Sequence, residues 1–207
     1  DYHAAQPEQD IVRSYRGLEE QHSFNEEWTQ AFLNAMEQDL HKQRYESMED
    51  LREYMHGSAE VIGLMITRII GVDGHDEAAK ALGRGMQYLN FLRDIGEDRE
   101  LGRQYIPNDV VSKHDLPSLR REDTDDHEEA FADLITEEVR RGISWLDHGR
   151  DAFHAIPYRC RVPIRTATDM YEWTGRQLQR RPRRVYDDTV KPSTARILLR
   201  GLCNMIV

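Results

Sequence analysis

The middle of the chain carries a row of side chains suited to binding a cation. They repeat at the helical spacing i, i+3, i+7 and i+11, and are Gln87, Asn90, Asp94 and Asp98. At about 100° per residue, a helix would present them as one stripe about three turns long. Carboxylates stacked four residues apart repel each other. Two interpretations stay open: a polar surface face, or a site for a hard cation such as Mg²⁺, which takes few protein oxygens and completes its shell with phosphates and water.

The segment after the stripe adds groups suited to phosphate. Gly102 and Pro107 predict the end of a helix and a turn. Arg103 and Tyr105 lie between them, and a planar guanidinium can bind two phosphate oxygens at once. We therefore expect this segment to contact a diphosphate if the stripe binds Mg²⁺.

The composition limits the type of protein. The 207 residues are enough for one domain, residues 1–207, with a sizeable core. The net charge of −10 argues against nucleic acid as the main partner. Cys160 and Cys203 lack metal-type spacing, which indicates unpaired thiols in a reducing cytoplasm. The longest apolar run, residues 61–70, is too short to span a bilayer and no signal peptide is seen, so we expect a cytoplasmic protein.

Apolar residues recur at helical rather than alternating spacing, which predicts an all-α fold. The predicted helices are a short one within residues 1–25 and longer ones over 26–39, 50–70, 76–101, 126–150, 163–179 and 195–206. Ser47 and Asp50 have the spacing of a capping box before the helix over 50–70. Residues 108–126, with a run of charges, are predicted to form a solvated loop. The stripe thus lies in the second half of the helix over 76–101.

Two features of the predicted helices have both a structural and a functional interpretation. Asp39 falls on an apolar helix face, where a carboxylate needs a partner. A salt bridge to Arg44 or to another helix is the structural interpretation, and a role in a site is the other. The small residues Ser58, Ala59 and Gly63 lie among large apolar ones. They leave room either for a neighbouring helix or for the chain of a ligand.

Three sequence runs resemble the squalene/phytoene synthase family. The most specific one is GMQYLNFLRDIGEDRELGRQYIPNDV, which resembles the second aspartate-rich motif of the family, roughly QxxNxxRDxxEDxxxGRxYxP. Upstream, MEQDLHKQRYESMEDLREYMHGSAEVIGLM is similar to a further family segment. MYEWTGRQL, followed by RRVYDDTVKPSTAR, resembles the C-terminal tyrosine helix and Arg-Val segment. The residue pattern is most similar to that of prokaryotic phytoene synthases.

The resemblance implies a fold and a reaction. The fold would be an all-α isoprenoid-synthase-type helical bundle around a central cavity. The reaction would be the Mg²⁺-dependent, head-to-head condensation of two geranylgeranyl diphosphates to phytoene through a cyclopropylcarbinyl diphosphate, as in carotenoid biosynthesis. Mn²⁺ is an alternative ion, and no NADPH is expected for a phytoene synthase. The alternatives are a squalene-type synthase that uses farnesyl diphosphate, and a non-catalytic family member that acts as an assembly or partner protein.

The resemblance also implies roles for individual residues. Asn90, Asp94 and Asp98 would hold Mg²⁺, with Gln87 nearby. Asp94, Asp98, Tyr54 and Arg103 would be catalytic. The residues that would bind the prenyl diphosphate substrate are Gln87, Arg93, Arg103, Tyr105, Tyr171 and, less clearly by motif, Arg184. The apolar helix faces would line the cavity for the prenyl chains.

The sequence departs from the family in one respect. The family has a first aspartate-rich motif, DxxxD, on an earlier helix, and residues 1–50 contain no match for it. The chain therefore resembles the C-terminal two-thirds of a synthase that lacks the N-terminal helices, which keeps the non-catalytic alternative open. Because prenyl chains are hydrophobic, we also expect peripheral contact with a membrane. The basic residues within 176–184 would meet anionic lipid headgroups, or belong to a solvated loop or a diphosphate site.

Overall fold

The chain folds into helices joined by short connections. A computed structural model describes residues 6–187 and 190–206. The helical elements are α1 (Gln6–His22), α2 (Glu26–His41), α3 (Met48–Met55), the π-helical turn η1 (His56–Glu60), α4 (Val61–Ile70), α5 (Asp76–Arg93), α6 (Ile95–Glu100), α7 (Asn108–Lys113), α8 (Arg121–Asp126), α9 (Glu128–Arg150), the 3₁₀ turn η2 (Phe153–Ala155), α10 (Tyr158–Arg180), α11 (Arg184–Asp187) and α12 (Thr194–Asn204). Across the described residues no strand forms, and the only bridge is one between Arg44 and Gln104. The predicted all-α fold is confirmed.

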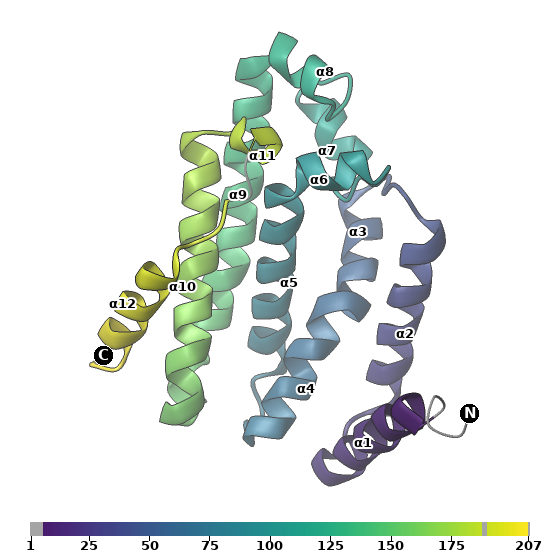
Figure 1. Cartoon of the computed structure of the whole chain (residues 1–207), viewed down its shortest axis with the longest axis vertical. Coiled ribbons are helices and arrows are strands. Elements are labelled where there is room, and N and C mark those ends of the chain that lie inside the picture. The colour runs from purple at the N-terminus through teal and green to yellow at the C-terminus, as the bar shows by residue number, and fades with distance from the viewer. Residues whose placement is uncertain (1–5, 188–189, 207) are drawn as a thin grey trace.

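Helix α5 is the central element, with α3 and α4 on one side and α9 and α10 on the other (Figure 1). Its residues Tyr88, Leu89 and Leu92 are fully buried. Glycine allows the close approach of α9, because a Cβ on Gly142 would lie 3.0 Å from the Leu89 side chain. The helix that carries the stripe is thus held rigidly by its neighbours.

The predicted helix over 50–70 is one helical rod with an interruption. The capping box is confirmed at its start, where Asp50 N–H donates to Ser47 Oγ at 3.2 Å. The interruption is η1, a single π-helical turn of the kind often found at functional sites. It brings Gly57 against α2, where a Cβ would lie 2.2 Å from the Ala31 carbonyl oxygen. Only glycine fits at this crossing.

The stripe helix ends earlier than predicted. Helix α5 stops at Arg93, and Asp94 takes a non-helical backbone conformation (φ −99°, ψ 14°) before α6 begins. The hydrogen bonds Asp94 N–H to Asn90 O (2.9 Å) and Asp98 N–H to Asp94 O (2.8 Å) nevertheless keep the i to i−4 pattern. The four stripe residues therefore stay in sequence along one path, with a bend at Asp94.

Two other predicted boundaries were wrong. Residues 108–126 contain α7 and α8 rather than only a loop, and α10 begins at Tyr158 rather than at Pro163. Pro163 lies within the second turn of α10, where its missing N–H removes a single intrahelical hydrogen bond. Local proline and charge signals misled the prediction, because packing between helices decided these boundaries.

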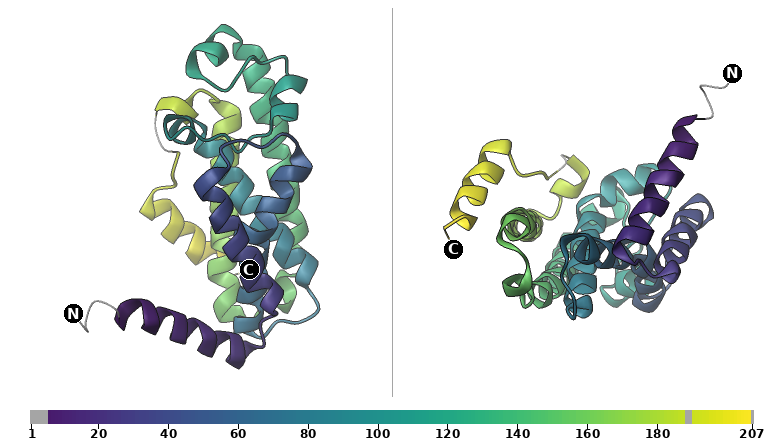
Figure 2. Two further views of the ribbon diagram at one scale, coloured as in Figure 1. Left: turned by 90° about the vertical axis from the view of Figure 1, so that its right-hand side faces the viewer. Right: turned by 90° about the horizontal axis from the view of Figure 1, so that it is seen from below.

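Helices α1 and α12 lie at the periphery. Helix α1 projects from the lower end of α2, and α12 lies along the outer side of α10 (Figure 2). A hydrogen bond of 2.8 Å between the hydroxyls of Tyr15 and Thr29 links α1 to α2. Of the described helices, none is both long and apolar enough to cross a membrane.

Candidate active site

The upper end of α5 brings part of the stripe against α10. Asn90 Nδ2 lies 3.4 Å from Gln87 Oε1 and 3.4 Å from the Tyr171 hydroxyl oxygen. Both contacts are long, so they are weak hydrogen bonds. The structure thus brings together three of the predicted site residues, from helices that are far apart in sequence, without fixing them tightly.

Arg93 and Asp94 form an ion pair beside this group. Arg93 Nε and Nη2 donate to the two oxygens of Asp94 at 2.7 and 2.6 Å. The hydrogen bond to Asp94 raises the pKa of Arg93, although burial acts in the opposite direction. Both side chains are about one-fifth exposed (19% and 22%), so the pair faces partly toward solvent and can rearrange. An arginine that leaves this carboxylate would be available for a phosphate.

Asp98 is the electrostatically unsatisfied member of the stripe. Burial and, next in size, the negative charge of Asp94 together raise the pKa of Asp98 to about 7, against the opposing effect of Arg103. A carboxylate in this state lacks sufficient positive charge around it. A bound cation next to Asp94 and Asp98 would supply that charge.

Asp39 anchors the wall opposite α6. Its carboxylate accepts hydrogen bonds from the hydroxyls of Tyr54 (2.9 Å) and Tyr105 (3.0 Å). The tyrosines take the place of the salt bridge to Arg44 that we considered from the sequence. Arg103 Nη2 lies 3.5 Å from the Asp39 carbonyl oxygen, at the limit of a hydrogen bond. Predicted site residues from two separate segments, Tyr54 in α3 and Arg103 and Tyr105 after α6, therefore meet at one aspartate.

The rings around Asp39 form a buried aromatic cluster. The Phe91 and Tyr105 rings stack with centroids 4.1 Å apart, and Tyr45 and Tyr54 pack against them. Burial raises the pKa of Tyr54 and of Tyr105 above the ordinary value, so both phenols stay protonated donors. The cluster holds the two hydroxyls in fixed positions beside the acidic stripe. The role of Asp39 was visible in the sequence only as a carboxylate at an apolar helix position.

An apolar cavity of about 380 Å³ runs along α5 below the stripe. It is bounded by α4, α5 and α10. Its lining includes Ile62 and Ile66 on one side, and Gln87, Asn90 and Tyr171 at the polar end. Ser58, Ala59 and Gly63 also line it, and Gly63 allows α5 to approach, since a Cβ there would lie 2.5 Å from the Ala79 carbonyl oxygen. The small residues therefore serve both close packing and the cavity.

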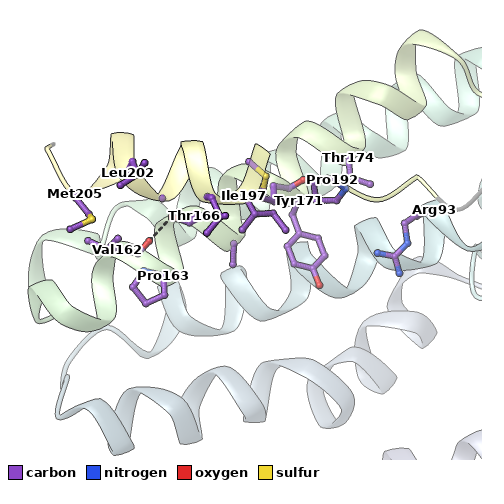
Figure 3. Close-up of a pocket in the computed structure, with 14 residues that line it drawn as sticks. Arg93, Val162, Pro163, Thr166, Tyr171, Thr174, Pro192, Ile197, Leu202 and Met205 are labelled. Atoms are coloured by element: carbon purple, nitrogen blue, oxygen red, sulfur yellow. Dashed lines mark hydrogen bonds between the residues drawn. The ribbon is translucent and has the colours of Figure 1, made fainter. Parts of the chain in front are cut away.

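A second apolar hollow, of about 810 Å³, lies between α10 and α12. Arg93 is at one end and Met205 at the other, and Tyr171 projects between them toward α5 (Figure 3). Tyr171 lines both spaces. Ala167 lines both spaces as well, so this face of α10 lies between the two apolar spaces.

Comparison with known proteins places this arrangement in a family. A family model for squalene/phytoene synthase matches residues 2–197. The chain belongs to the squalene/phytoene synthase family. Among relatives, it is 34% identical over 116 residues to phytoene synthase 1 of Arabidopsis thaliana. It is 30% identical over 150 residues to the 15-cis-phytoene synthase of Synechocystis, and 25% identical over 182 residues to that of Paracoccus.

The similarity covers different shares of each chain. The three matches cover 52%, 65% and 87% of this chain, but only 25%, 44% and 59% of the respective relatives. Solved structures show the same fold: squalene synthase HpnC from Alicyclobacillus acidocaldarius (TM-score 0.73, 23% identity, covering 81% of this chain and 64% of that one) and a dehydrosqualene synthase in complex with a ligand (TM-score 0.71, 20% identity, covering 88% and 65%). The isoprenoid-synthase-type fold expected from the sequence is thus confirmed.

As a squalene/phytoene synthase family member, the chain has the oxygen donors for a hard cation in its second aspartate-rich motif. Asn90, Asp94 and Asp98 offer an amide and two carboxylates. Nowhere in residues 6–187 and 190–206 do three His, Cys, Asp or Glu side chains gather closely enough to hold a metal. The oxygen donors of the stripe fit Mg²⁺ in type, since this ion takes few protein ligands, and binding of the ion stays a prediction. The unsatisfied charge of Asp98 is consistent with that fit.

Among the described residues, Arg184 is joined to no other predicted site residue by a hydrogen bond or ion pair. It is half-buried at the start of α11, which lies against α6. The hollow of about 350 Å³ beside Arg93 and Asp94 is lined from α11 by Val185, Tyr186 and Asp187. The role of Arg184 in substrate binding stays a prediction.

Proposed function

We propose that this chain carries the diphosphate-binding half of an enzyme that condenses two molecules of geranylgeranyl diphosphate head to head into phytoene. The observation that supports the proposal most directly is an apolar cavity that ends at Gln87, Asn90 and Tyr171, next to Asp94 and Asp98. A substrate with a hydrophobic prenyl chain and a charged diphosphate end needs such a boundary between an apolar and a charged region. Similarity to proteins named phytoene synthase supports this choice of substrate.

In the first half-reaction, one substrate loses diphosphate and its allylic carbon alkylates the double bond of the other, which loses a proton as the ring of a cyclopropylcarbinyl diphosphate closes. In the second, that diphosphate leaves, the skeleton rearranges, and loss of a proton gives the hydrocarbon. Arg93 and Arg103 would bind the diphosphate oxygens and stabilise the charge that develops on departure. Asn90, Asp94 and Asp98 would hold Mg²⁺, with Mn²⁺ as an alternative, and the bound ion would act as a Lewis acid on the leaving diphosphate.

The tyrosines and the apolar cavity would act on the carbocations. The Tyr54 and Tyr105 hydroxyls, held by Asp39, would stay in fixed positions near the leaving group. The isoleucines and small residues of α4 and η1 would exclude water, which would otherwise capture the allylic cation. Exclusion of water and charge stabilisation are thus assigned to different parts of the same cavity.

A turnover assay tests the proposal. The purified chain is incubated with geranylgeranyl diphosphate and Mg²⁺ without NADPH, and the extract is analysed by chromatography and mass spectrometry. We expect phytoene. Squalene formed from farnesyl diphosphate, and only with NADPH, would contradict the substrate and favour the squalene-type alternative.

A second candidate function is a non-catalytic partner protein of the same family. We consider it because residues 1–50 contain no match for the first DxxxD motif of the family. Calorimetry with Mg²⁺ and a non-hydrolysable thiolodiphosphate analogue of the substrate discriminates between the two. Mg²⁺-dependent binding with no turnover would support the partner protein, whereas turnover would exclude it.

We also propose peripheral membrane contact through the basic residues of 176–184, because substrate chains and product are insoluble in water. Arg176 pairs with Glu172, and Arg183 pairs with Asp125 and Glu128, so part of this positive charge is already compensated. Sedimentation with anionic vesicles at low and high salt tests the contact. Binding that salt reduces is expected, and absence of binding at low salt would contradict it.

A further inference from the structure

A polar hollow of about 450 Å³ lies apart from the acidic stripe. Three arginines from separate segments line it: Arg44 before α3, Arg99 on α6 and Arg120 before α8. The rest of its polar lining is Gln104, Asn108, Ser112, Ser118 and Asp123. None of the stripe residues and none of the tyrosines on Asp39 lines this hollow.

The three arginines converge without carboxylate partners of their own. In the part of the chain that the structure describes, neighbouring arginines are paired, Arg93 with Asp94, Arg121 with Asp187 and Arg183 with Glu128, but no ion pair includes Arg44, Arg99 or Arg120. Asp123 accepts a hydrogen bond from Ser118 and supplies the single negative charge of the lining. The hollow therefore has an excess of two positive charges.

Arg99 is held in place but incompletely satisfied. Its Nη1 donates to Gln104 Oε1 at 3.2 Å, and Gln104 is itself fixed by donation to the Ile106 carbonyl oxygen and to Asn108 Oδ1, each at 3.0 Å. Arg99 Nε is buried and has no hydrogen-bond partner. A buried N–H without a partner is unfavourable, and an acceptor in the hollow would remove that cost.

The chemistry of the lining identifies the class of ligand. Guanidinium groups bind the oxygens of phosphate in pairs, and phosphate carries about two negative charges near neutral pH. Backbone hydrogen bonds from Gln104 N–H to Gln43 O (2.8 Å) and from Asn108 N–H to Tyr45 O (2.9 Å) join the segments that carry Arg44 and follow Arg99. An oxyanion held here would brace α6 against the segment before α3.

We propose that Arg44, Arg99 and Arg120 form a binding site for a phosphate-type oxyanion, distinct from the prenyl diphosphate site. The source of the phosphate is either free in solution or the headgroup of a phosphorylated lipid. The site does not depend on Mg²⁺, because its lining supplies positive charge directly. It also does not depend on the condensation reaction proposed above.

Calorimetric titration with inorganic phosphate, without Mg²⁺ and at constant ionic strength, tests the site. The double variant Arg44→Gln/Arg120→Gln removes two exposed charges and should retain the fold, which circular dichroism verifies. Arg140→Gln, an exposed arginine on α9, is the matched control. We expect saturable binding by the wild type, weakening by at least about tenfold in the double variant, and no change in the control.

Three results would overturn the proposal. They are no saturable phosphate binding by the wild type, equal affinity in the double variant, and loss of phosphate binding in Arg93→Gln, which would place the anion at the stripe instead. Vesicles with and without phosphatidic acid then distinguish the sources. Competition between these vesicles and phosphate, lost in the double variant, indicates a lipid headgroup, and its absence indicates free phosphate.

Discussion

The two walls of the candidate site differ in how completely their polar groups are satisfied. On the Asp39 wall, two buried hydroxyls donate to one carboxylate at 2.9 and 3.0 Å within a stacked aromatic cluster. On the stripe, Asn90 makes only contacts of 3.4 Å, Asp94 relies on an adjacent arginine, and burial and neighbouring acids raise the pKa of Asp98 to about 7. The Asp39 wall is complete in the sense that its carboxylate and both donor hydroxyls are paired without a ligand, although the buried Tyr45 hydroxyl beside them has no partner. The stripe is the incomplete wall, because its polar groups are expected to be fully paired only with a cation and a diphosphate bound.

The largest effect should come from removing charge on the incomplete wall. We expect Asp94→Ala and Asp98→Ala each to lower phytoene formation by about 10²–10³-fold, because charge stabilisation of the leaving diphosphate would be lost. Glu100→Ala is the control, since Glu100 is an exposed residue of the same motif that lies outside the stripe. Initial rates measure the effect. Unchanged turnover in both stripe variants would contradict the assigned role.

Removing the Asp39 carboxylate from the complete wall should lower the stability of the folded protein. Asp39→Ala leaves the Tyr54 and Tyr105 hydroxyls without their acceptor, and we expect a loss of about 2 kcal/mol in the free energy of unfolding. Urea denaturation measures it, and Glu37→Ala, an exposed acid on the same helix, should change stability by less than about 0.5 kcal/mol. Equal effects of the two substitutions would show that the carboxylate does not anchor the tyrosines.

On the incomplete wall, removing a carboxylate charge is expected to raise, and not lower, the stability of the metal-free protein. The folded-state pKa of Asp98, about 7, lies above the unfolded value of about 3.9, so the folded state holds its proton more tightly. The wild type therefore loses stability as pH rises from about 4 to 7. We expect Asp98→Asn to be more stable than wild type by about 1 kcal/mol at pH 8, after allowance for solvent screening, and to equal it near pH 4.

Thermal unfolding of both proteins in a metal chelator measures this difference. Glu100→Gln serves as a matched control that should show no such pH dependence. A stability difference between Asp98→Asn and wild type that is the same at pH 4 and pH 8 would show that the Asp98 charge does not destabilise the folded protein.

Substitutions of single hydroxyls compare the two walls directly, and the smallest effect of all is expected for Tyr171. Tyr54→Phe removes a hydrogen bond of 2.9 Å to a carboxylate and should cost about 1–2 kcal/mol in unfolding free energy. Tyr171→Phe removes a contact of 3.4 Å to Asn90 and should cost less than about 0.5 kcal/mol. Urea denaturation of the two variants side by side measures the contrast, and the reverse order would refute it.

Helical periodicity was sufficient to predict the long helices and the stripe, because both depend on spacing within one segment, but it missed the short helices α7 and α8. The tyrosine partners of Asp39 could not be predicted, since Tyr54 and Tyr105 belong to other segments and meet it only through packing. The break at Asp94 was also missed, because its neighbours favour helix and tertiary packing decides where α5 ends. The arginine hollow joins residues 44, 99 and 120, which share no period. The sequence therefore predicts which residues share one helix face better than it predicts which residues of different segments contact each other.

The π-helical turn at His56–Glu60 has a consequence for changes in chain length. Tyr54 and Ile62 are eight residues apart, so a regular helix would separate them by about 80° around its axis. A π-turn takes up one additional residue and reduces the separation to about 20°, which keeps Tyr54 directed at Asp39 while Ile62 lines the cavity. A one-residue deletion inside the turn should therefore be tolerated, whereas the same deletion within α4 should rotate the isoleucines away from the cavity. In evolutionary terms, this turn is where an insertion or deletion can be absorbed without losing either function of the helix.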